Sequence, residues 1–169
     1  MAIVGDIRPL PVSERNKNDA LYRELEIKMQ QLGYLTPYRE TLNWQHTIGA
    51  VECGEPAGLQ LLKKRAAKND GVPFFLAKHM KKTIFRQLIL HPNDQGFYLP
   101  YRFEAPFELE IQGNKIWFGS IIQLAEELKW LEIAMNQEAS EEVVAYWEKM
   151  RSLCQIALDA ESPFEWKVE

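Results

Sequence analysis

The last third of the chain has the clearest helical pattern of apolar positions. From Ser120 onward, apolar side chains recur at steps of three and four residues, namely Ile121, Leu124, Leu128, Leu131 and Met135. This spacing predicts an amphipathic helix, and Gln123 completes a capping box with Ser120 at its start. A second helix is expected from about Ser140, because acidic residues at 141 and 142 suit a helical first turn. We expect the two helices to pack as an antiparallel pair.

Two further helical patterns lie in the first half of the chain. The first begins at about Asp19 and ends at Gly33, a residue type that suits the left-handed position after a helix. The second begins at Pro56, which suits a first helical turn, and ends in the run Asn69-Asp70-Gly71. We therefore expect N-terminal helices.

Both ends of the chain have weaker patterns. Pro9 and Pro11 indicate an extended N-terminal arm over residues 1–12. Ser162-Pro163 indicates the end of the structured region, and we expect a short C-terminal tail over residues 162–169.

The middle of the chain changes to the alternation typical of strands. Residues 107–111 alternate between apolar and polar side chains, and Gly113-Asn114 separates them from a second run at 115–118. Gly and Asn tolerate the positive φ angles of tight hairpin turns, so this pattern predicts a β-hairpin. A further strand is expected over residues 97–103, and a short one between His46 and Cys53.

Residues 74–90 fit either a helix or a strand. Apolar residues four apart favour a helix, whereas the runs at 83–85 and 88–90 favour a strand. We expect a helix to about Lys82 and a strand from about Thr83 to Leu90. The whole pattern then predicts one α+β domain over residues 1–169, with N-terminal helices, a small central antiparallel sheet at about residues 83–118 and a C-terminal antiparallel helix pair.

Composition supports a globular protein. The chain has 169 residues, of which 46% are hydrophobic and 26% charged, values close to the globular average. The first residues carry no apolar run like that of a secretory signal, and no apolar stretch is long enough to cross a bilayer. The two cysteines, Cys53 and Cys154, do not make a disulfide framework. We expect a cytoplasmic protein with no membrane contact.

Charge is strongly segregated along the chain. Between Lys63 and Arg86 there are eight basic residues and one acid, whereas residues 104–169 carry fourteen carboxylates and five basic side chains. The net charge of the chain is −4. This segregation has two explanations. The basic segment packs against the acidic helices within the protein, or it forms a surface for an anionic partner.

Catalytic and ligand-binding motifs are poorly represented. No glycine pattern of a nucleotide-binding loop occurs, and His46, His79 and His91 are scattered, so we expect neither a metal site nor a cofactor. Cys53 precedes a predicted helix start, where amide groups favour a thiolate, and His46 could act as its base. A small thiol-dependent enzyme is therefore one alternative, although we favour a protein that is not an enzyme.

Two groups of residues are candidates for binding. Lys78, Lys81 and Lys82 can share one side of a helical turn, which suits an anion or a nucleic acid. Tyr98, Tyr101 and Arg102 belong to a residue class that protein interfaces favour.

The leading hypothesis is a non-catalytic interaction or regulatory module that binds a protein partner or a second copy of itself. The alternative is binding of nucleic acid or another anion through residues 63–86.

Overall fold

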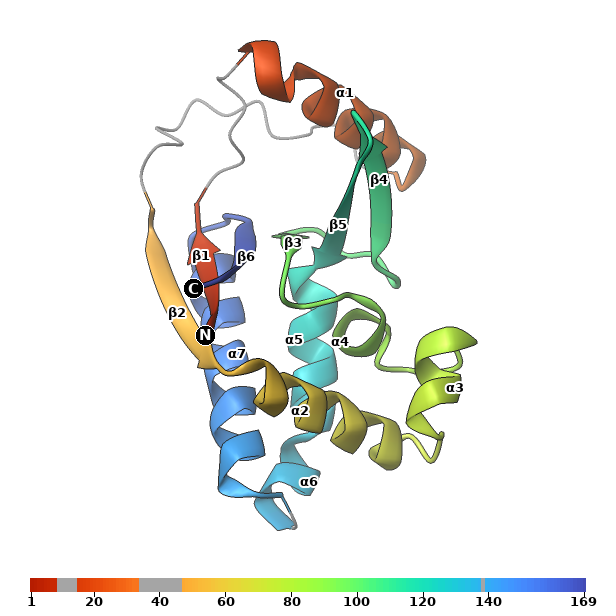
Figure 1. Cartoon of the computed structure of the whole chain (residues 1–169), viewed down its shortest axis with the longest axis vertical. Helices are drawn as coiled ribbons and strands as arrows, with labels where there is room; N and C mark the ends of the chain where they lie inside the picture. Colours follow the sequence, from red (N-terminus) through yellow and green to blue (C-terminus); the bar gives the residue numbers. More distant parts are fainter. Residues whose placement is uncertain (9–14, 34–46, 138) are drawn as a thin grey trace.

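The computed structural model describes residues 1–8, 15–33, 47–137 and 139–169, and the chain order of its elements is seen in Figure 1. The strands are β1 (Ile3–Ile7), β2 (Gly49–Gly54), β3 (Gly96–Leu99), β4 (Phe107–Ile111), β5 (Asn114–Ser120) and β6 (Phe164–Val168). The helices are α1 (Arg15–Gln31), α2 (Pro56–Asn69), α3 (Phe74–His79), α4 (Arg86–Leu90), α5 (Ile121–Trp130), α6 (Glu132–Gln137) and α7 (Glu141–Asp159).

The mixed α/β composition is confirmed, but the prediction of a small antiparallel sheet is wrong. The six strands of the described residues form one sheet in the order β2-β1-β6-β3-β5-β4. Most neighbouring pairs are antiparallel, whereas β3 and β5 run parallel. The parallel pair arises because the chain after β3 forms β4 at the sheet edge and returns through β5 between them.

The two ends of the chain form central strands of this sheet. Within the arm expected at residues 1–12, Ile3–Ile7 forms β1, and residues 9–12 lie outside the described residues. In place of the tail expected at 162–169, Phe164–Val168 forms β6. These strands pair antiparallel, and the termini lie side by side in Figure 1. Burial of Ile3, Ile7 and Phe164 explains the difference, because each end contributes apolar side chains to a core that the other end completes.

The strand expected from Thr83 to Leu90 is wrong, and the helix expected to extend to Lys82 ends earlier. Helix α3 ends at His79, and residues 86–90 form the short helix α4. The carboxylate of Glu127 accepts hydrogen bonds from the backbone N–H groups of Gln87 (3.1 Å) and Leu88 (3.0 Å). This long-range cap satisfies amide groups that would otherwise be unpaired at the start of α4.

The predicted hairpin is confirmed, with its turn one residue earlier than expected. Ile111 pairs with Asn114, so the turn is formed by Gln112 and Gly113, which have φ angles of 52° and 81°. A two-residue turn with both φ angles positive matches the right-handed twist of the flanking strands.

The predicted helix starts at Ser120 and Ser140 are confirmed. Each serine hydroxyl accepts a hydrogen bond from the backbone N–H three residues later, as expected for N-caps. Three helices follow β5 rather than two, because α6 is inserted between α5 and α7. The expectation of a single C-terminal helix pair is therefore not confirmed.

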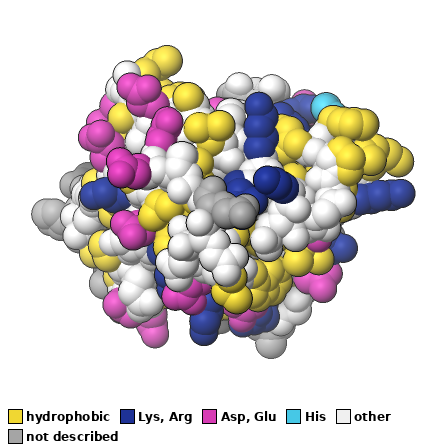
Figure 2. All heavy atoms as spheres, turned by 90° about the horizontal axis from the view of Figure 1, so that it is seen from below, with side chains coloured by type: hydrophobic (Ala, Val, Ile, Leu, Met, Phe, Trp, Pro, Cys, Tyr) yellow, Lys and Arg dark blue, Asp and Glu magenta, His cyan; other side chains and the backbone are white. Residues whose placement is uncertain are grey.

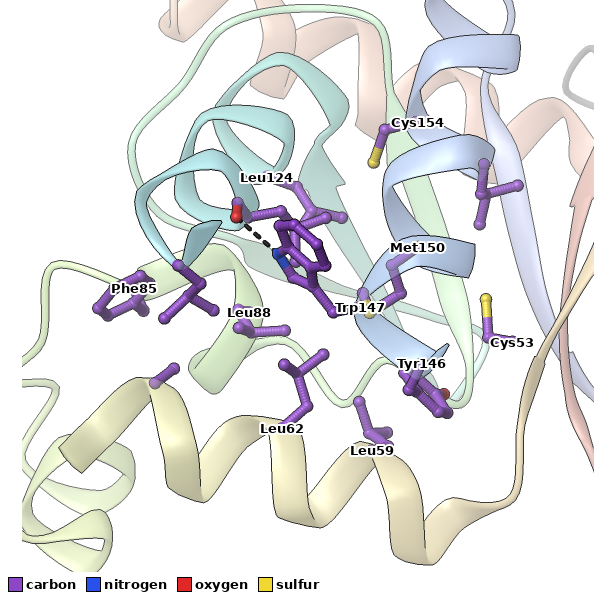
Figure 3. Packing of buried hydrophobic residues seen from close by; sticks show 14 of the residues in the cluster. Cys53, Leu59, Leu62, Phe85, Leu88, Leu124, Tyr146, Trp147, Met150 and Cys154 are labelled. Carbon is purple, nitrogen blue, oxygen red and sulfur yellow. Dashed lines mark hydrogen bonds between the residues drawn. The ribbon is translucent and has the colours of Figure 1, made fainter. Parts of the chain in front are cut away.

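Helix α7 packs against both the sheet and its neighbouring helices. Its buried residues recur at helical spacing, and Trp147 donates a hydrogen bond from Nε1 to the Leu128 carbonyl (2.7 Å), as Figure 3 shows. The side chains of Leu62 and Leu88 lie on the other side of this cluster, on α2 and α4. Gly5 on β1 allows close contact, since a Cβ there would overlap Leu153. The fold thus holds α7 rigidly with one face outward.

We expect Glu127 to make folding stability depend on pH. Burial raises the pKa of Glu127 from its usual value of 4.5 to about 8, although two backbone hydrogen bonds oppose the shift. The folded state therefore binds the proton more tightly than the unfolded state, and stability falls as the pH rises from about 5 to about 8. Glu127→Gln should flatten this part of the profile, whatever its effect on absolute stability, as measured by urea unfolding across that range.

Glu126→Gln is the matched control. The hydrogen bond from Arg102 lowers the pKa of Glu126, so this group titrates below the range tested and its loss should leave the slope unchanged. Equal slopes for the wild type and Glu127→Gln would contradict the assignment.

Candidate functional site

The outward face of α7 carries a row of carboxylates. Glu141, Glu148 and Asp159 are all exposed, and seven and eleven residues separate them in sequence. These separations are close to two and three helical turns, so the three side chains lie on one line, about 10 and about 16 Å apart along the axis. The residues between them on this line are exposed and uncharged, namely Ala145, Ser152 and Gln155. We call Glu141, Glu148 and Asp159 the acidic ridge.

Further carboxylates lie beside the start of the ridge. Glu55 is the N-cap residue of α2 and is exposed. A Cβ placed on Gly58 would lie 3.5 Å from Oε1 of Glu142, so Glu142 lies next to the first turn of α2. Figure 2 shows Asp and Glu gathered on the α7 and β2 side of the lower face, with Lys and Arg at its centre and toward α3. Acidic side chains therefore predominate on the α7 and β2 side of this face, with some basic side chains among them.

No ion pair neutralises the acidic ridge within the described ranges. The described carboxylates that do form ion pairs are outside the ridge, namely Asp6, Glu104, Glu108, Glu126, Glu132 and Glu165. Asp159 accepts a hydrogen bond from Nε2 of Gln155 (2.8 Å), a neutral donor on the same helix. The ridge thus keeps its negative charge available to a partner.

Among the described residues, the basic segment forms no ion pair with the acidic C-terminal helices. Within residues 63–86, the one such pair is Arg86 with Glu104 (3.1 Å), and Glu104 precedes β4. Lys63 is buried and donates hydrogen bonds to the carbonyls of His91 (2.8 Å) and Pro92 (3.1 Å). Burial lowers the pKa of Lys63 to about 8, so this lysine is an internal group.

The three candidate lysines are at the surface. Lys78 is on α3, and Lys81 and Lys82 are in the loop that follows it; all three are exposed. Beside them, Phe75 is 62% exposed and Met80 is 56% exposed. The structure therefore brings these lysines together with apolar side chains on one protruding segment.

The three candidates of the 97–103 stretch are in different environments. Tyr98 is completely buried, and its Oη lies 2.6 Å from Oδ1 of Asn93 and 2.9 Å from the Gln87 carbonyl oxygen. Tyr101 is half-buried and packs against the apolar cluster between α1 and β4. Arg102 is exposed and donates two hydrogen bonds to the carboxylate of Glu126 on α5 (2.6 and 2.9 Å).

Tyr98 consequently has no surface with which to contact a partner. Its ring stacks on that of His91 at 4.4 Å, and burial raises the pKa of its hydroxyl. Its polar atom is satisfied internally, which is what a buried tyrosine requires. Strand β3 ends at Leu99, so Tyr101 and Arg102 do not continue its alternation.

The environment of Cys53 does not favour thiol chemistry. Cys53 is 5% exposed, and burial raises the pKa of its thiol to about 12, so it is protonated at neutral pH. His46, the base considered for it, lies outside the described residues. His91 is buried, and burial lowers its pKa to about 3, so it is neutral. In the part of the chain that the structure describes, no cluster of three or more potential metal ligands occurs.

None of the described helices is both long enough and apolar enough to span a membrane.

Comparison with known proteins identifies a family. A family model described as "Putative DNA-mimic protein" matches residues 35–166, which is more than half of the chain, and the chain therefore belongs to this family. The comparison with curated proteins has no match, and neither does the comparison with solved structures.

The acidic ridge was not among the residues expected from the sequence. Its signal was present in the spacing of Glu141, Glu148 and Asp159 within one predicted helix. The helical spacing that predicts the buried apolar face also predicts which charged residues share the opposite, outward face.

We expect both cysteines to be unreactive in the native protein. Burial raises the pKa of Cys53 to about 12 and also raises that of Cys154. Because the thiolate is the reactive form, modification with iodoacetamide at pH 7.5 should be much slower than for free cysteine and should accelerate on unfolding in urea. Peptide mass spectrometry would measure both sites. Rapid native labelling of Cys53 alone would contradict its placement and restore the thiol-enzyme hypothesis.

Proposed function

We propose that this member of the DNA-mimic family binds a DNA-binding protein by presenting carboxylates where that protein normally contacts phosphates. The observation that carries the proposal is the acidic ridge of α7, whose three carboxylates are exposed, aligned and without cationic partners among the described residues. The membership of the family supports a protein partner, and the ridge supplies a chemical basis for its recognition.

The electrostatics of DNA binding explain how such a surface acts. Proteins that bind DNA place Lys and Arg against phosphates, and release of counterions supplies much of the affinity. A carboxylate can accept the same charge-assisted hydrogen bonds from those side chains. A protein with a cationic DNA cleft is therefore attracted to the ridge, and the attraction should weaken as salt rises.

The spacing of the ridge limits how completely it imitates a duplex. Successive phosphates of one DNA strand are about 3.4 Å apart along the axis, whereas the ridge carboxylates are about 10 and about 16 Å apart. The ridge thus offers negative charge over a length of about eight base pairs, on a straight line that does not follow the helical path of a phosphate strand. Glu55 and Glu142 add charge beside it and broaden the acidic surface.

The rigidity of α7 favours this role. Its buried face packs through Trp147, Met150 and Leu153, each at most 4% exposed. The helix backbone that carries the carboxylates is ordered before binding, so docking of a partner costs conformational entropy in the side chains alone. The proposal keeps the leading sequence hypothesis of a non-catalytic protein-binding module and moves the expected contact from the 97–103 stretch to α7.

The test combines capture with competition. The full chain is immobilised, proteins from the source cells are captured at moderate salt, and duplex DNA is then added as the competitor. We expect duplex DNA to release the captured partner. A variant with Glu141→Gln, Glu148→Gln and Asp159→Asn should bind the purified partner at least about tenfold more weakly, a loss of about 1.4 kcal/mol.

The matched control removes three exposed carboxylates outside the ridge, through Glu24→Gln, Glu110→Gln and Glu169→Gln. It makes the same change in net charge and should retain most of the affinity, which separates the ridge from a general charge effect. A partner that duplex DNA does not displace, or that binds the ridge variant as tightly as the wild type, would refute the proposal.

A further inference from the structure

The segment after α3 displays its lysines on a fixed backbone. Oδ2 of Asp70 accepts a hydrogen bond from the backbone N–H of Ile84 (3.1 Å), which ties the loop to the end of α2. Oγ1 of Thr83 accepts another from the N–H of Phe85 (3.0 Å). Lys81 has a φ of 55°, a left-handed conformation that is uncommon for a residue other than glycine. The loop therefore adopts a defined turn that directs charged side chains outward.

An exposed aromatic ring accompanies these charges. Phe75 is 62% exposed on α3, one turn from Lys78, whereas the adjacent Phe74 packs against the core. An exposed aromatic face can stack on a nucleic-acid base, so Phe75 adds a second kind of contact beside the lysines. Figure 2 shows apolar side chains beside Lys and Arg at the α3 side of this face.

The basic segment also has lysines on α2, which packs against α3. Burial lowers the pKa of Lys63 on α2, and the charge of Lys78 on α3 lowers it further. On α2, Lys64 and Lys68 are exposed one turn apart, and they line a groove with Ser140 and Val143 at the start of α7. None of Lys64, Lys68, Lys78, Lys81 and Lys82 forms an ion pair with another described residue. Lys78, Lys81 and Lys82, together with Phe75, lie on α3 and the loop that follows it, and we call these four residues the cationic face.

We propose that the cationic face binds single-stranded nucleic acid, as a second site separate from the acidic ridge. The lysines suit the phosphates, and Phe75 suits an unpaired base, which a duplex would keep inside its own stack. The rest of the chain is acidic, so its field opposes a polyanion, and binding should be of moderate strength and strongly salt-dependent.

Fluorescence anisotropy with a labelled mixed-sequence oligonucleotide tests the proposal. The full chain is titrated at several salt concentrations, and the logarithm of the affinity should fall linearly with the logarithm of the salt concentration. Replacing Lys78, Lys81 and Lys82 with Gln should make this slope less steep by about 2, because each lost phosphate contact removes about 0.7 for a single strand. Phe75→Ala should weaken binding about tenfold with the slope unchanged, because stacking releases no counterions.

Two controls assign the effect to this face. Replacing Lys115, Lys129 and Lys149 with Gln makes the same change in net charge elsewhere and should leave the slope almost unchanged. The ridge variant (E141Q, E148Q and D159N) should not weaken oligonucleotide binding, so this test fails or succeeds independently of the proposed function.

Several results would overturn the inference. The first is absence of binding at low salt, and the second is binding that the three lysine substitutions do not alter. Tighter binding to a duplex than to the single strand would exclude the stacking role of Phe75. The last such result would come from sedimentation velocity. If the wild type self-associates and the lysine variant does not, the cationic face binds the acidic surface of a second copy instead.

Discussion

The buried side chain of Gln87 is the contact on which the placement of both surfaces depends. Its Nε2 donates hydrogen bonds to the carbonyls of Phe103 and Glu104 (both 3.0 Å), and its Oε1 accepts one from the backbone N–H of Ser120 (2.9 Å). Its own N–H is bound by Glu127. One residue therefore joins α4 to the start of α5 and to the chain before β4. Since each of these polar groups is satisfied only in this arrangement, leaving any unpaired would be costly.

This arrangement separates the charges of the molecule. Helix α4 follows the lysine-bearing loop, and the α5 helix that Glu127 links to it packs against α7, so one network positions the cationic face and supports the acidic ridge. Lys63 lies between these regions as a buried cation bound to backbone carbonyls. Charges that could have neutralised one another are instead directed to different parts of the surface, which suits a protein that meets charged partners.

The parts of the fold that the sequence predicts well are those with local causes. The caps at Ser120 and Ser140, the helical spacing that follows them and the β4–β5 hairpin all depend on residues within a few positions of one another. The parts that it predicts poorly depend on distant partners. Residues 86–90 become a helix because Glu127 caps them from about forty positions away, and β1 and β6 form because the two chain ends pair. The local sequence of a short apolar run does not indicate such distant partners.

The same distinction applies to the candidate site. Residue type placed Tyr98, Tyr101 and Arg102 together, yet burial separates a core tyrosine from an exposed arginine four positions later. The lysines at 78, 81 and 82 could be identified from the sequence, because long charged side chains are seldom buried, although Lys63 is an exception. Prediction of the acidic ridge requires both the helical spacing and the burial of neighbouring residues. Its alignment follows from helical geometry alone, but its outward direction follows from Trp147, Met150 and Leu153 being the residues that the sheet and α5 enclose. The proposed partner surface therefore depends on the apolar residues that set the orientation of α7, because they determine which carboxylates are exposed.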